Sequence, residues 1–214
     1  MQLSPQTQRR ATADRIARHL PLLLLLLSAL ALLLAPSLMP VSYSWLSHTT
    51  SESAAQGVPG AWLARLGFQL FGFGVLWIAA RQRADWGWTV YLLHCAFGVL
   101  IIATAAFSTR SWENGAAFDP VEDGLHSFTA TAMGFAFAFG TGLRMIQRLR
   151  RSQKGWGLDA LALAAATFLP LAMNFLPGMD GLLQRLMFGI AYLWYSREGM
   201  QTWEESLIQR EGQR

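Results

Sequence analysis

The sequence predicts an all-α protein, a polytopic transmembrane bundle of six helices, and three observations predict it. Hydrophobic residues make up 53% of the 214 residues and charged residues only 14%, whereas a soluble domain carries about 25% charged residues. Six apolar runs approach the roughly 20 residues that a helix needs to cross a bilayer. The 17 Lys and Arg residues collect in alternate segments between these runs. A chain of this length cannot bury so much apolar surface within itself, so we expect the excess to face lipid.

The six expected spans differ in how apolar they are. The first, third and fifth carry no charged residue except Asp159 at one end. The last is the least apolar, because Arg185 and Arg197 leave only eleven uncharged residues between them. Both guanidinium groups must therefore reach the membrane surfaces along their aliphatic stems. The expected spans are 20–39, 62–80, 90–107, 127–143, 158–175 and 182–196.

The first apolar run also has features of a secretory signal, because four arginines precede a leucine-rich stretch. The stretch 20–34 is longer than the apolar core of such a signal, and the small-residue pattern at 29–31 lies inside it rather than after it. We therefore expect this segment to be retained as a span.

The distribution of basic residues predicts the orientation, since cytoplasmic loops carry an excess of Lys and Arg. With the N-terminus inside, 14 of the 17 basic residues fall on the cytoplasmic side, and only Arg65, Arg110 and Arg185 fall outside. We expect a basic cytoplasmic N-terminus at 1–19, a membrane domain at 20–203 and a cytoplasmic tail at 204–214. The cell membrane (inner, or cytoplasmic, membrane) is the expected location.

Composition and motifs exclude several classes of function. The net charge of +4 does not indicate nucleic-acid binding, because the basic residues sort by membrane side; membrane lipid is the expected surrounding partner. A single cysteine, Cys95, allows no internal disulfide. The sequence contains no phosphate-binding loop, dinucleotide fingerprint, HExxH or CxxC pattern. The basic segment 144–154 is interpreted as a cytoplasmic loop that sets the orientation.

A stripe of small residues runs along the fourth expected span. Ala130, Gly134, Ala138 and Gly142 are each four residues apart, so they share one helix face. Small residues let membrane helices approach closely. We expect this face to be buried against another helix, or to receive a partner helix or a second copy of the chain. The alternative is that Gly and Ala are merely common in membrane helices.

The first outer loop is expected to contain a short interfacial helix. Pro40 could open a helix and Gly57, followed by Pro59, would end it. The segment 42–56 would then lie along the membrane surface, with Trp45 dipping inward.

Two histidines on the expected outer side have carboxylates at helical spacing. His48 and Glu52 are four residues apart, and Asp123 and His126 are three apart. Each pair would share a helix face if its segment were helical. His126 also continues the small-residue stripe and should point into the bundle, where ionisable groups are candidates for function.

The same four side chains allow three interpretations. His48, Glu52, Asp123 and His126 could form an outward polar pocket or a proton relay. They could instead bind a divalent metal, with the histidines as ligands and a carboxylate as ligand or general base. The third interpretation is that the acidic residues only cap a helix start beside a satisfied imidazole.

Short motifs along 20–200 resemble the domain-of-unknown-function family 998. This resemblance implies a prokaryotic membrane protein with about six helices and no assigned activity. It also implies that the Asp123 and His126 pair and the Gln184 and Arg185 pair are family positions. The motifs are Tyr43-Ser44-Trp45-Leu46-Ser47 with Ser51-Glu52, Gly67-Phe68 leading to Gly72, Asp123-Gly124-Leu125-His126, and Gly181-Leu182-Leu183-Gln184-Arg185.

The residues leave three functions open. The first is a non-enzymatic protein that binds or moves a small solute or lipid through an outward-facing polar pocket. The second is a metal-assisted intramembrane hydrolase acting on lipid. The third is a structural or assembly subunit, a homo-oligomer or the partner of another membrane protein, joined through the fourth span.

Overall fold

The computed structural model describes the backbone of residues 5–211 and the side chains of residues 19–201. Over the described backbone the chain is all helical, with five α-helices and no strand. Two short 3-10 helices, η1 and η2, lie between the first two. The cytoplasmic tail expected at 204–214 and nearly all of the basic segment expected at 1–19 lie outside the described side chains. The elements are α1 (Pro5–Leu34), η1 (Ala35–Leu38), η2 (Glu52–Ala54), α2 (Ala61–Ala106), α3 (Pro120–Arg150), α4 (Trp156–Met173) and α5 (Asp180–Glu211).

Three helical stretches in the described part of the chain are long and apolar enough to cross a membrane. They are His19–Leu38, Ala61–Ala106 and Trp156–Met173. The helices α3 and α5 are more polar, since α3 carries basic residues in its last turn and α5 begins with an acidic residue. The fold is therefore that of an all-helical membrane protein.

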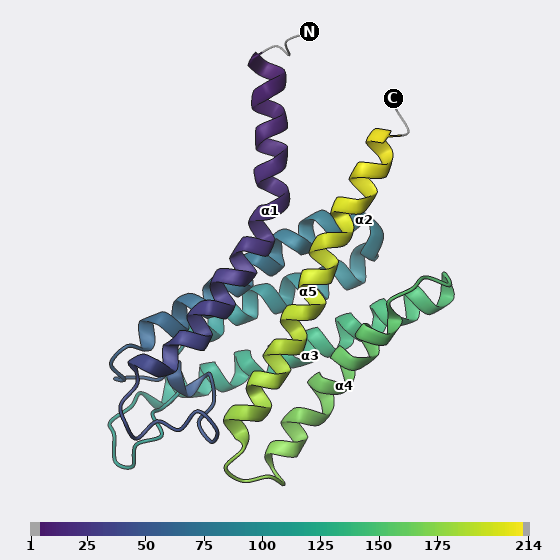
Figure 1. Ribbon diagram of the computed structural model, residues 1–214. Coiled ribbons are helices and arrows are strands. Elements are labelled where there is room, and N and C mark those ends of the chain that lie inside the picture. Colours follow the sequence, from purple (N-terminus) through teal and green to yellow (C-terminus); the bar gives the residue numbers. More distant parts are fainter. Residues whose placement is uncertain (1–4, 212–214) are drawn as a thin grey trace.

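The helix α2 consists of two arms that meet at Gly87. Its 46 residues would span about 69 Å if straight, which is more than twice the hydrocarbon thickness of a bilayer. Gly87 interrupts the helix at φ 71° and ψ 172°, a conformation that residues with a side chain rarely adopt. The arms then run back against each other (Figure 1). They contain the second and third predicted spans, with a sharp corner in place of a loop.

Glycines let the two arms of α2 touch. A Cβ atom on Gly72 would lie 2.6 Å from the carbonyl oxygen of Gly98, and a Cβ on Gly98 would lie 3.1 Å from the carbonyl oxygen of Gly72. Such a short separation brings backbone against backbone, as small residues allow in membrane bundles.

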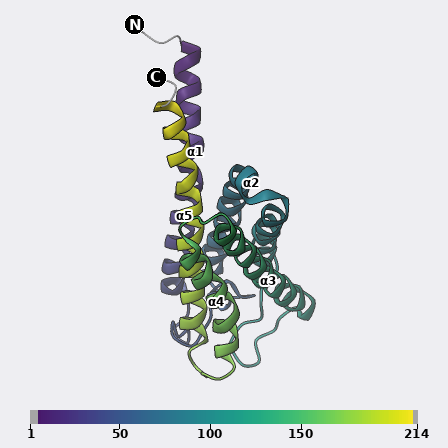
Figure 2. The same cartoon turned by 90° about the vertical axis from the view of Figure 1, so that its right-hand side faces the viewer.

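The bundle has two different ends. The helix α1 begins and α5 ends at the same end, which we call the terminal end (Figure 1). The corner of α2 and the turn between α3 and α4 also lie there, because Arg151 donates to the carbonyl of Asp85 and Arg197 donates to the carbonyl of Gly155. Three connections, at 39–60, 107–119 and 174–179, meet at the opposite end, which we call the loop end. In a second view α1 and α5 lie on one side of the bundle and α2 and α3 on the other (Figure 2).

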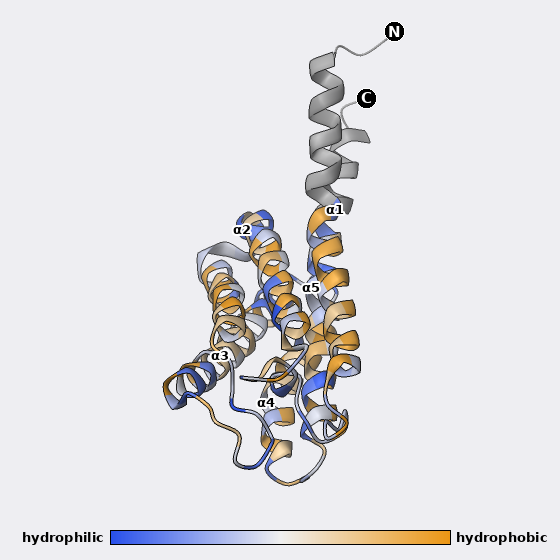
Figure 3. Cartoon of the chain, turned by 90° about the vertical axis from the view of Figure 1, so that its left-hand side faces the viewer, coloured by the Kyte–Doolittle hydropathy of each residue, from blue (hydrophilic) through white to orange (hydrophobic). Residues whose placement is uncertain are grey.

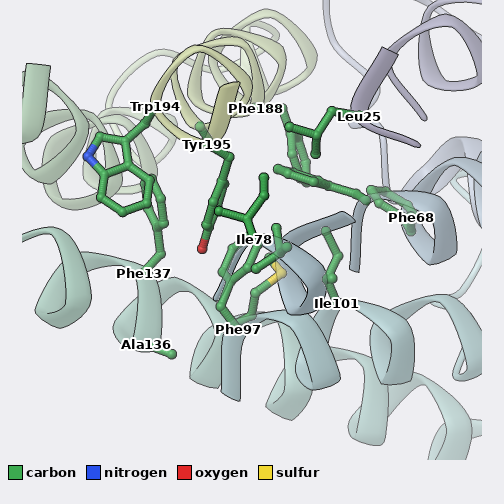
Figure 4. Close-up of a cluster of buried hydrophobic side chains, with 14 of the residues drawn as sticks. Leu25, Phe68, Ile78, Phe97, Ile101, Ala136, Phe137, Phe188, Trp194 and Tyr195 are labelled. Carbon is green, nitrogen blue, oxygen red and sulfur yellow. The ribbon is translucent and has the colours of Figure 1, made fainter. Parts of the chain in front are cut away.

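Aromatic side chains fill the centre of the bundle (Figure 4). Phe97 from α2, Phe137 from α3, and Trp194 and Tyr195 from α5 are buried there. The rings meet edge to face or tilted, with centroids 4.9–5.9 Å apart, in the range that favours aromatic pairs. Many large apolar side chains are also exposed on the outside of the helices, and Figure 3 shows how hydrophobic residues are distributed along them. Such exposed apolar side chains suit a bundle in contact with lipid.

The interfacial helix expected over 42–56 is not present. Only Glu52–Ala54 forms a 3-10 turn, and the rest of the segment consists of turns. Its hydroxyl side chains bond to the nearby backbone: Ser53 Oγ donates to the carbonyl of Thr50 at 2.6 Å, and Ser44 Oγ accepts from the amide of Ser47 at 3.3 Å. Ser and Thr side chains that bond locally compete with helix formation. The prediction of a helix here was therefore wrong.

The contact between the arms of α2 gives a first prediction. Gly72→Leu should lower the free energy of unfolding in detergent by about 2–3 kcal/mol or more, because the new side chain meets a backbone carbonyl that cannot move aside. Gly189→Leu is the matched control, since a Cβ on Gly189 meets no described atom within 4 Å. Equal stability of the two variants in a denaturant titration would show that the arms do not touch at Gly72.

Candidate functional site

A polar cleft of about 840 Å³ opens at the loop end. Its walls come from all three connections, because 47–52, 109–118 and 178–180 contribute lining residues. Three carboxylates line the cleft, against one guanidinium. These charged residues are Glu52, Glu113, Asp180 and Arg110. The cleft therefore has an excess of negative charge.

The ring of His48 lies in the wall of the cleft. Its Nδ1 accepts a hydrogen bond from the amide of Ser44 at 2.8 Å, so the proton of the neutral imidazole resides on Nε2. The ring stacks on Trp112, with centroids 5.1 Å apart and planes at 28°. Tyr43 packs edge-on against Trp112. The first and second connections are thus joined by aromatic contacts.

Glu52 stabilises the first connection. One carboxylate oxygen accepts from the amide of Thr49 at 2.6 Å and from its hydroxyl at 2.9 Å. The Thr49 hydroxyl in turn accepts from the amide of Glu52 at 3.1 Å. This reciprocal arrangement has the hydrogen-bond pattern of a capping box, here within a turn and not at the start of an α-helix. The carboxylate of Glu52 therefore stabilises the turn at Thr49 and also lines the cleft.

Asp123 and His126 secure the second connection to the start of α3. Asp123 accepts from the hydroxyl of Thr109 at 2.9 Å and from the amide of Arg110 at 2.8 Å. His126 is buried, and its Nδ1 lies 2.7 Å from the carbonyl oxygen of Phe107. A carbonyl can only accept, so His126 Nδ1 carries the proton. Neither residue lines the cleft.

The four residues singled out in the sequence therefore lie in two places. His48 and Glu52 line the cleft, whereas Asp123 and His126 lie behind its wall. Among the side chains of residues 19–201, no three His, Cys, Asp or Glu residues are grouped as metal ligands would be. The predicted ligand set of His48, His126, Glu52 and Asp123 is not assembled.

Two arginines fix the first connection by binding its carbonyl groups. Arg185 Nη1 donates to the carbonyls of Trp45 and His48 at 2.7 and 2.9 Å. Arg65 donates to the carbonyls of Ala54 and Ala55 at 3.1 and 3.0 Å. Each arginine lies in an early turn of its helix, α5 or α2. These hydrogen bonds hold the turns of the first connection in place, so that it forms a fixed wall of the cleft.

The hydroxyl of Tyr43 completes this clamp. It accepts from Arg185 Nη2 at 2.6 Å and donates to the carbonyl of Thr49 at 2.9 Å. Burial raises the pKa of Tyr43 above its usual value, although the Arg185 guanidinium opposes the shift. The hydroxyl therefore remains a donor throughout the physiological pH range.

An apolar pocket of about 610 Å³ adjoins the cleft. It lies between α3 and α4, and Phe68 and Ile101 of α2 and Phe188 of α5 close it on the inside. Ser51 lines both the cleft and the pocket. The two cavities therefore lie on either side of this residue or next to it.

The small-residue stripe of α3 forms one wall of the apolar pocket. Ala130, Gly134 and Ala138 line it. A Cβ atom on Gly134 would meet no described atom within 4 Å, and one on Gly142 would meet only Leu163, at 3.6 Å. The close helix contact expected along this stripe is replaced by a hollow over most of its length.

A buried ionic cluster lies at the terminal end. Arg148 donates to both carboxylate oxygens of Asp159, at 2.6 and 2.7 Å, and to Glu198 at 2.7 Å. Arg197 reaches Asp159 and Glu198 at 2.5 and 2.8 Å, and Arg144 pairs with Asp85. Arg144 and Arg148 are 1% exposed, and Asp159 and Glu198 are fully buried. We call these six residues, Asp85, Arg144, Arg148, Asp159, Arg197 and Glu198, the ionic cluster.

Aromatic residues connect the ionic cluster to the core. Trp194 Nε1 donates to Asp159 at 2.7 Å and Trp86 Nε1 donates to Glu198 at 2.9 Å. The buried ring of His94 packs against both indoles, with centroids 4.6 and 4.7 Å away. The carboxylates are thus bonded by indole groups as well as by guanidinium groups.

The ionic cluster was not predicted from the sequence. The segment 144–154 was interpreted as a loop, whereas α3 continues to Arg150 and buries Arg144 and Arg148. A usable signal was present: the two arginines are four residues apart and extend the face marked by His126. Asp159 in the fifth expected span and Glu198, two residues after the sixth, were candidate partners that the sequence reading did not consider.

The comparisons with known proteins identify one family. The family model described as a protein of unknown function (DUF998) matches residues 17–197. No curated protein and no solved structure gives a significant match. The match extends over the residues that line both cavities and over five of the six residues of the ionic cluster.

The ionic cluster gives a second prediction. Glu198→Gln should lower the free energy of unfolding by about 3–5 kcal/mol, because it leaves buried guanidinium charge uncompensated. Glu113→Gln, at an exposed carboxylate of the loop end, is the matched control and should change stability by less than about 1 kcal/mol. The two variants are compared by denaturant titration in detergent, and equal effects would argue against a buried cluster.

Proposed function

The chain belongs to DUF998, a family of unknown function, and from that premise we propose that it is an integral membrane protein that binds a small polar molecule in an outward-facing cleft. The polar molecule is either a free solute or the polar part of a larger compound. The single observation that carries this proposal is the cleft of about 840 Å³ at the loop end. Ligand sites occupy about 300–1,000 Å³ and are usually preformed.

The proposed topology has six crossings, with both termini in the cytoplasm. Two observations support it. The corner at Gly87 divides α2 into two arms, which together with the other four helices make six segments. Exposed basic residues collect at the terminal end, which suits a cytoplasmic surface. They are Arg83, Arg150, Arg151 and Lys154. The loop end would then face outward from the cytoplasmic membrane.

The chemistry of the cleft favours a ligand that carries an amine. Three carboxylates face one guanidinium, and Trp112 offers an aromatic ring. Ammonium groups bind both carboxylates and aromatic faces. Asp180 is the most available of the three carboxylates, because Glu52 is engaged by Thr49 and Glu113 accepts from Ser42 at 3.1 Å.

The hydrogen bonds of the Glu52 and Asp123 carboxylates favour a ligand-binding protein over a metal-assisted hydrolase. A general base must be free to accept a proton from the reacting water. One oxygen of the Glu52 carboxylate and one of the Asp123 carboxylate are instead each bonded to a loop amide and a hydroxyl. These groups shape the cleft, and that is the role expected in a binding protein.

Reporter fusions test the topology. We expect green fluorescent protein fused after residue 214 to fluoresce, because it folds in the cytoplasm, and alkaline phosphatase inserted after Gly115 to be active, because it requires the outer compartment. Gly115 lies in an exposed turn with φ +79°, where insertions are tolerated. An active phosphatase at the C-terminus combined with an inactive one at Gly115 would reverse the orientation.

Ethanolamine tests the cleft, with ethylene glycol as the uncharged probe of equal size. Saturation-transfer NMR in detergent should show ethanolamine binding about tenfold more tightly, because a charged hydrogen bond contributes about 1.5–3 kcal/mol. Asp180→Asn should remove this preference and Asp180→Glu should retain it. Equal binding of the two probes to the wild-type protein would contradict the proposal.

A further inference from the structure

The apolar pocket between α3 and α4 is not accounted for by the binding of a polar molecule. Polar lining is limited to a few hydroxyls and one amide, and the remaining lining is aliphatic or aromatic. Three large apolar side chains of the lining are also exposed on the outer face of the bundle. These are Phe135, Phe139 and Leu171, with exposed fractions of 60%, 61% and 53%. The pocket therefore opens sideways, toward the space that lipid occupies around a membrane bundle.

The pocket lies next to the cleft, and the two cavities share one lining residue. Ser51 lines both cavities. Gln184, which also lines the pocket, accepts from the amide of Ser51 at 3.2 Å and so holds that residue at the junction. A polar cavity at the loop end thus lies beside an apolar cavity between the helices. This order matches the two parts of an amphiphile.

We propose that the apolar pocket holds one acyl chain of a membrane lipid whose amine-bearing head group occupies the cleft. This inference rests on the proposed function, since it assigns the polar group in the cleft to a lipid. The chain lies along the small-residue face of α3, against Ala130, Gly134 and Ala138, and enters from the outer leaflet beside Ser51. Phosphatidylethanolamine is the lipid class with this chemistry.

The size of the pocket favours an acyl chain over a partner helix. A helix is at least about 10 Å across, and two turns of it fill a cylinder of roughly 850 Å³. The pocket offers about 610 Å³, and four helices of the same chain enclose it. An extended chain is narrower and bends to fit. A partner helix, or α3 of a second copy, could reach only the outer rim at Phe135 and Phe139.

The pocket itself does not discriminate between lipid classes, because an acyl chain that enters it moves from the apolar bilayer into an equally apolar cavity. The head group decides which lipid is held. An excess of carboxylates in the cleft disfavours an anionic head group and favours one with an ammonium group. We therefore expect the cleft to select the lipid by its head group and the pocket to immobilise its acyl chain.

The experiment uses phosphatidylethanolamine with a diazirine near the end of one chain, in nanodiscs of phosphatidylglycerol. After irradiation, peptide mass spectrometry locates the attached lipid. We expect attachment to α3 and α4 around Ala138, Phe139 and Leu163. Gly134→Leu should reduce this attachment about tenfold, because its side chain fills the pocket.

The matched control is Gly189→Leu, which adds the same side chain on an exposed face outside the pocket. Both positions have room for a Cβ, so both variants should unfold at the wild-type denaturant concentration. Attachment in Gly189→Leu should equal that of the wild type. Equal attachment in Gly134→Leu and the wild type would overturn the inference, and so would labels spread evenly over all exposed helix faces.

Two further arms separate this inference from the proposed function. If Gly134→Leu loses chain attachment but still binds ethanolamine, head group and chain occupy separate cavities, as proposed. If ethanolamine binds but the diazirine never labels the pocket, the cleft takes a free solute and the lipid assignment fails. A diazirine phosphatidylglycerol that labels the pocket as strongly as phosphatidylethanolamine would also overturn it. Cysteine crosslinks between two copies at Phe135 would assign the face to a dimer instead.

Discussion

The structure depends on the pairing of charges that lie inside a lipid-embedded bundle. Arg148 is bonded to Asp159 of α4 and Glu198 of α5, and Arg144 to Asp85 in α2. Four helices are thus tied at one end by groups that are costly to separate, since a buried charge without its partner is strongly destabilising. Guanidinium groups and carboxylates balance three against three within the ionic cluster. The same α3 and α4 that the ionic cluster ties together at the terminal end line the apolar pocket farther along the bundle.

Arginines shape the loop end in a different way. Arg65 and Arg185 bind main-chain carbonyls, not carboxylates. A loop without helix or strand leaves its carbonyls unpaired, and a guanidinium group with five donors can serve several of them at once. The backbone of the first connection is also bonded to the second, where the amide of Gln56 donates to the carbonyl of Thr109 at 2.9 Å. The cleft therefore has walls that are fixed before any ligand arrives, which lowers the entropy lost on binding.

The sequence predicted the all-helical membrane fold and the family, because apolar runs and short motifs are local properties. It did not predict the corner at Gly87, since a single glycine between two helices carries no periodic signal. The site was predicted only in part. His48 and Glu52 lie in the cleft, but the spacing rule assumed a helix over 42–56, and without that helix their relation to Asp123 and His126 was undetermined. Arg144 and Arg148 were assigned to a loop because a basic segment between apolar runs is normally exposed, and only tertiary contacts show where α3 ends.

The glycines show why a small-residue pattern alone does not predict helix contact. Removing a side chain creates space, and the element across from it decides how that space is used. Opposite Gly72 lies the backbone of Gly98, opposite Gly140 lies the ring of His94, and opposite Gly134 lies no described atom within 4 Å. The space at Gly72 allows a helix contact, the space at Gly140 accommodates the buried imidazole that packs between two indoles, and the space at Gly134 is a cavity. All three arise from one residue type in membrane helices, so the function of each is set by residues distant in sequence. The pocket at Gly134 is available to a ligand because α4 presents small and flexible residues there, with Ala166 and Leu163 across the hollow.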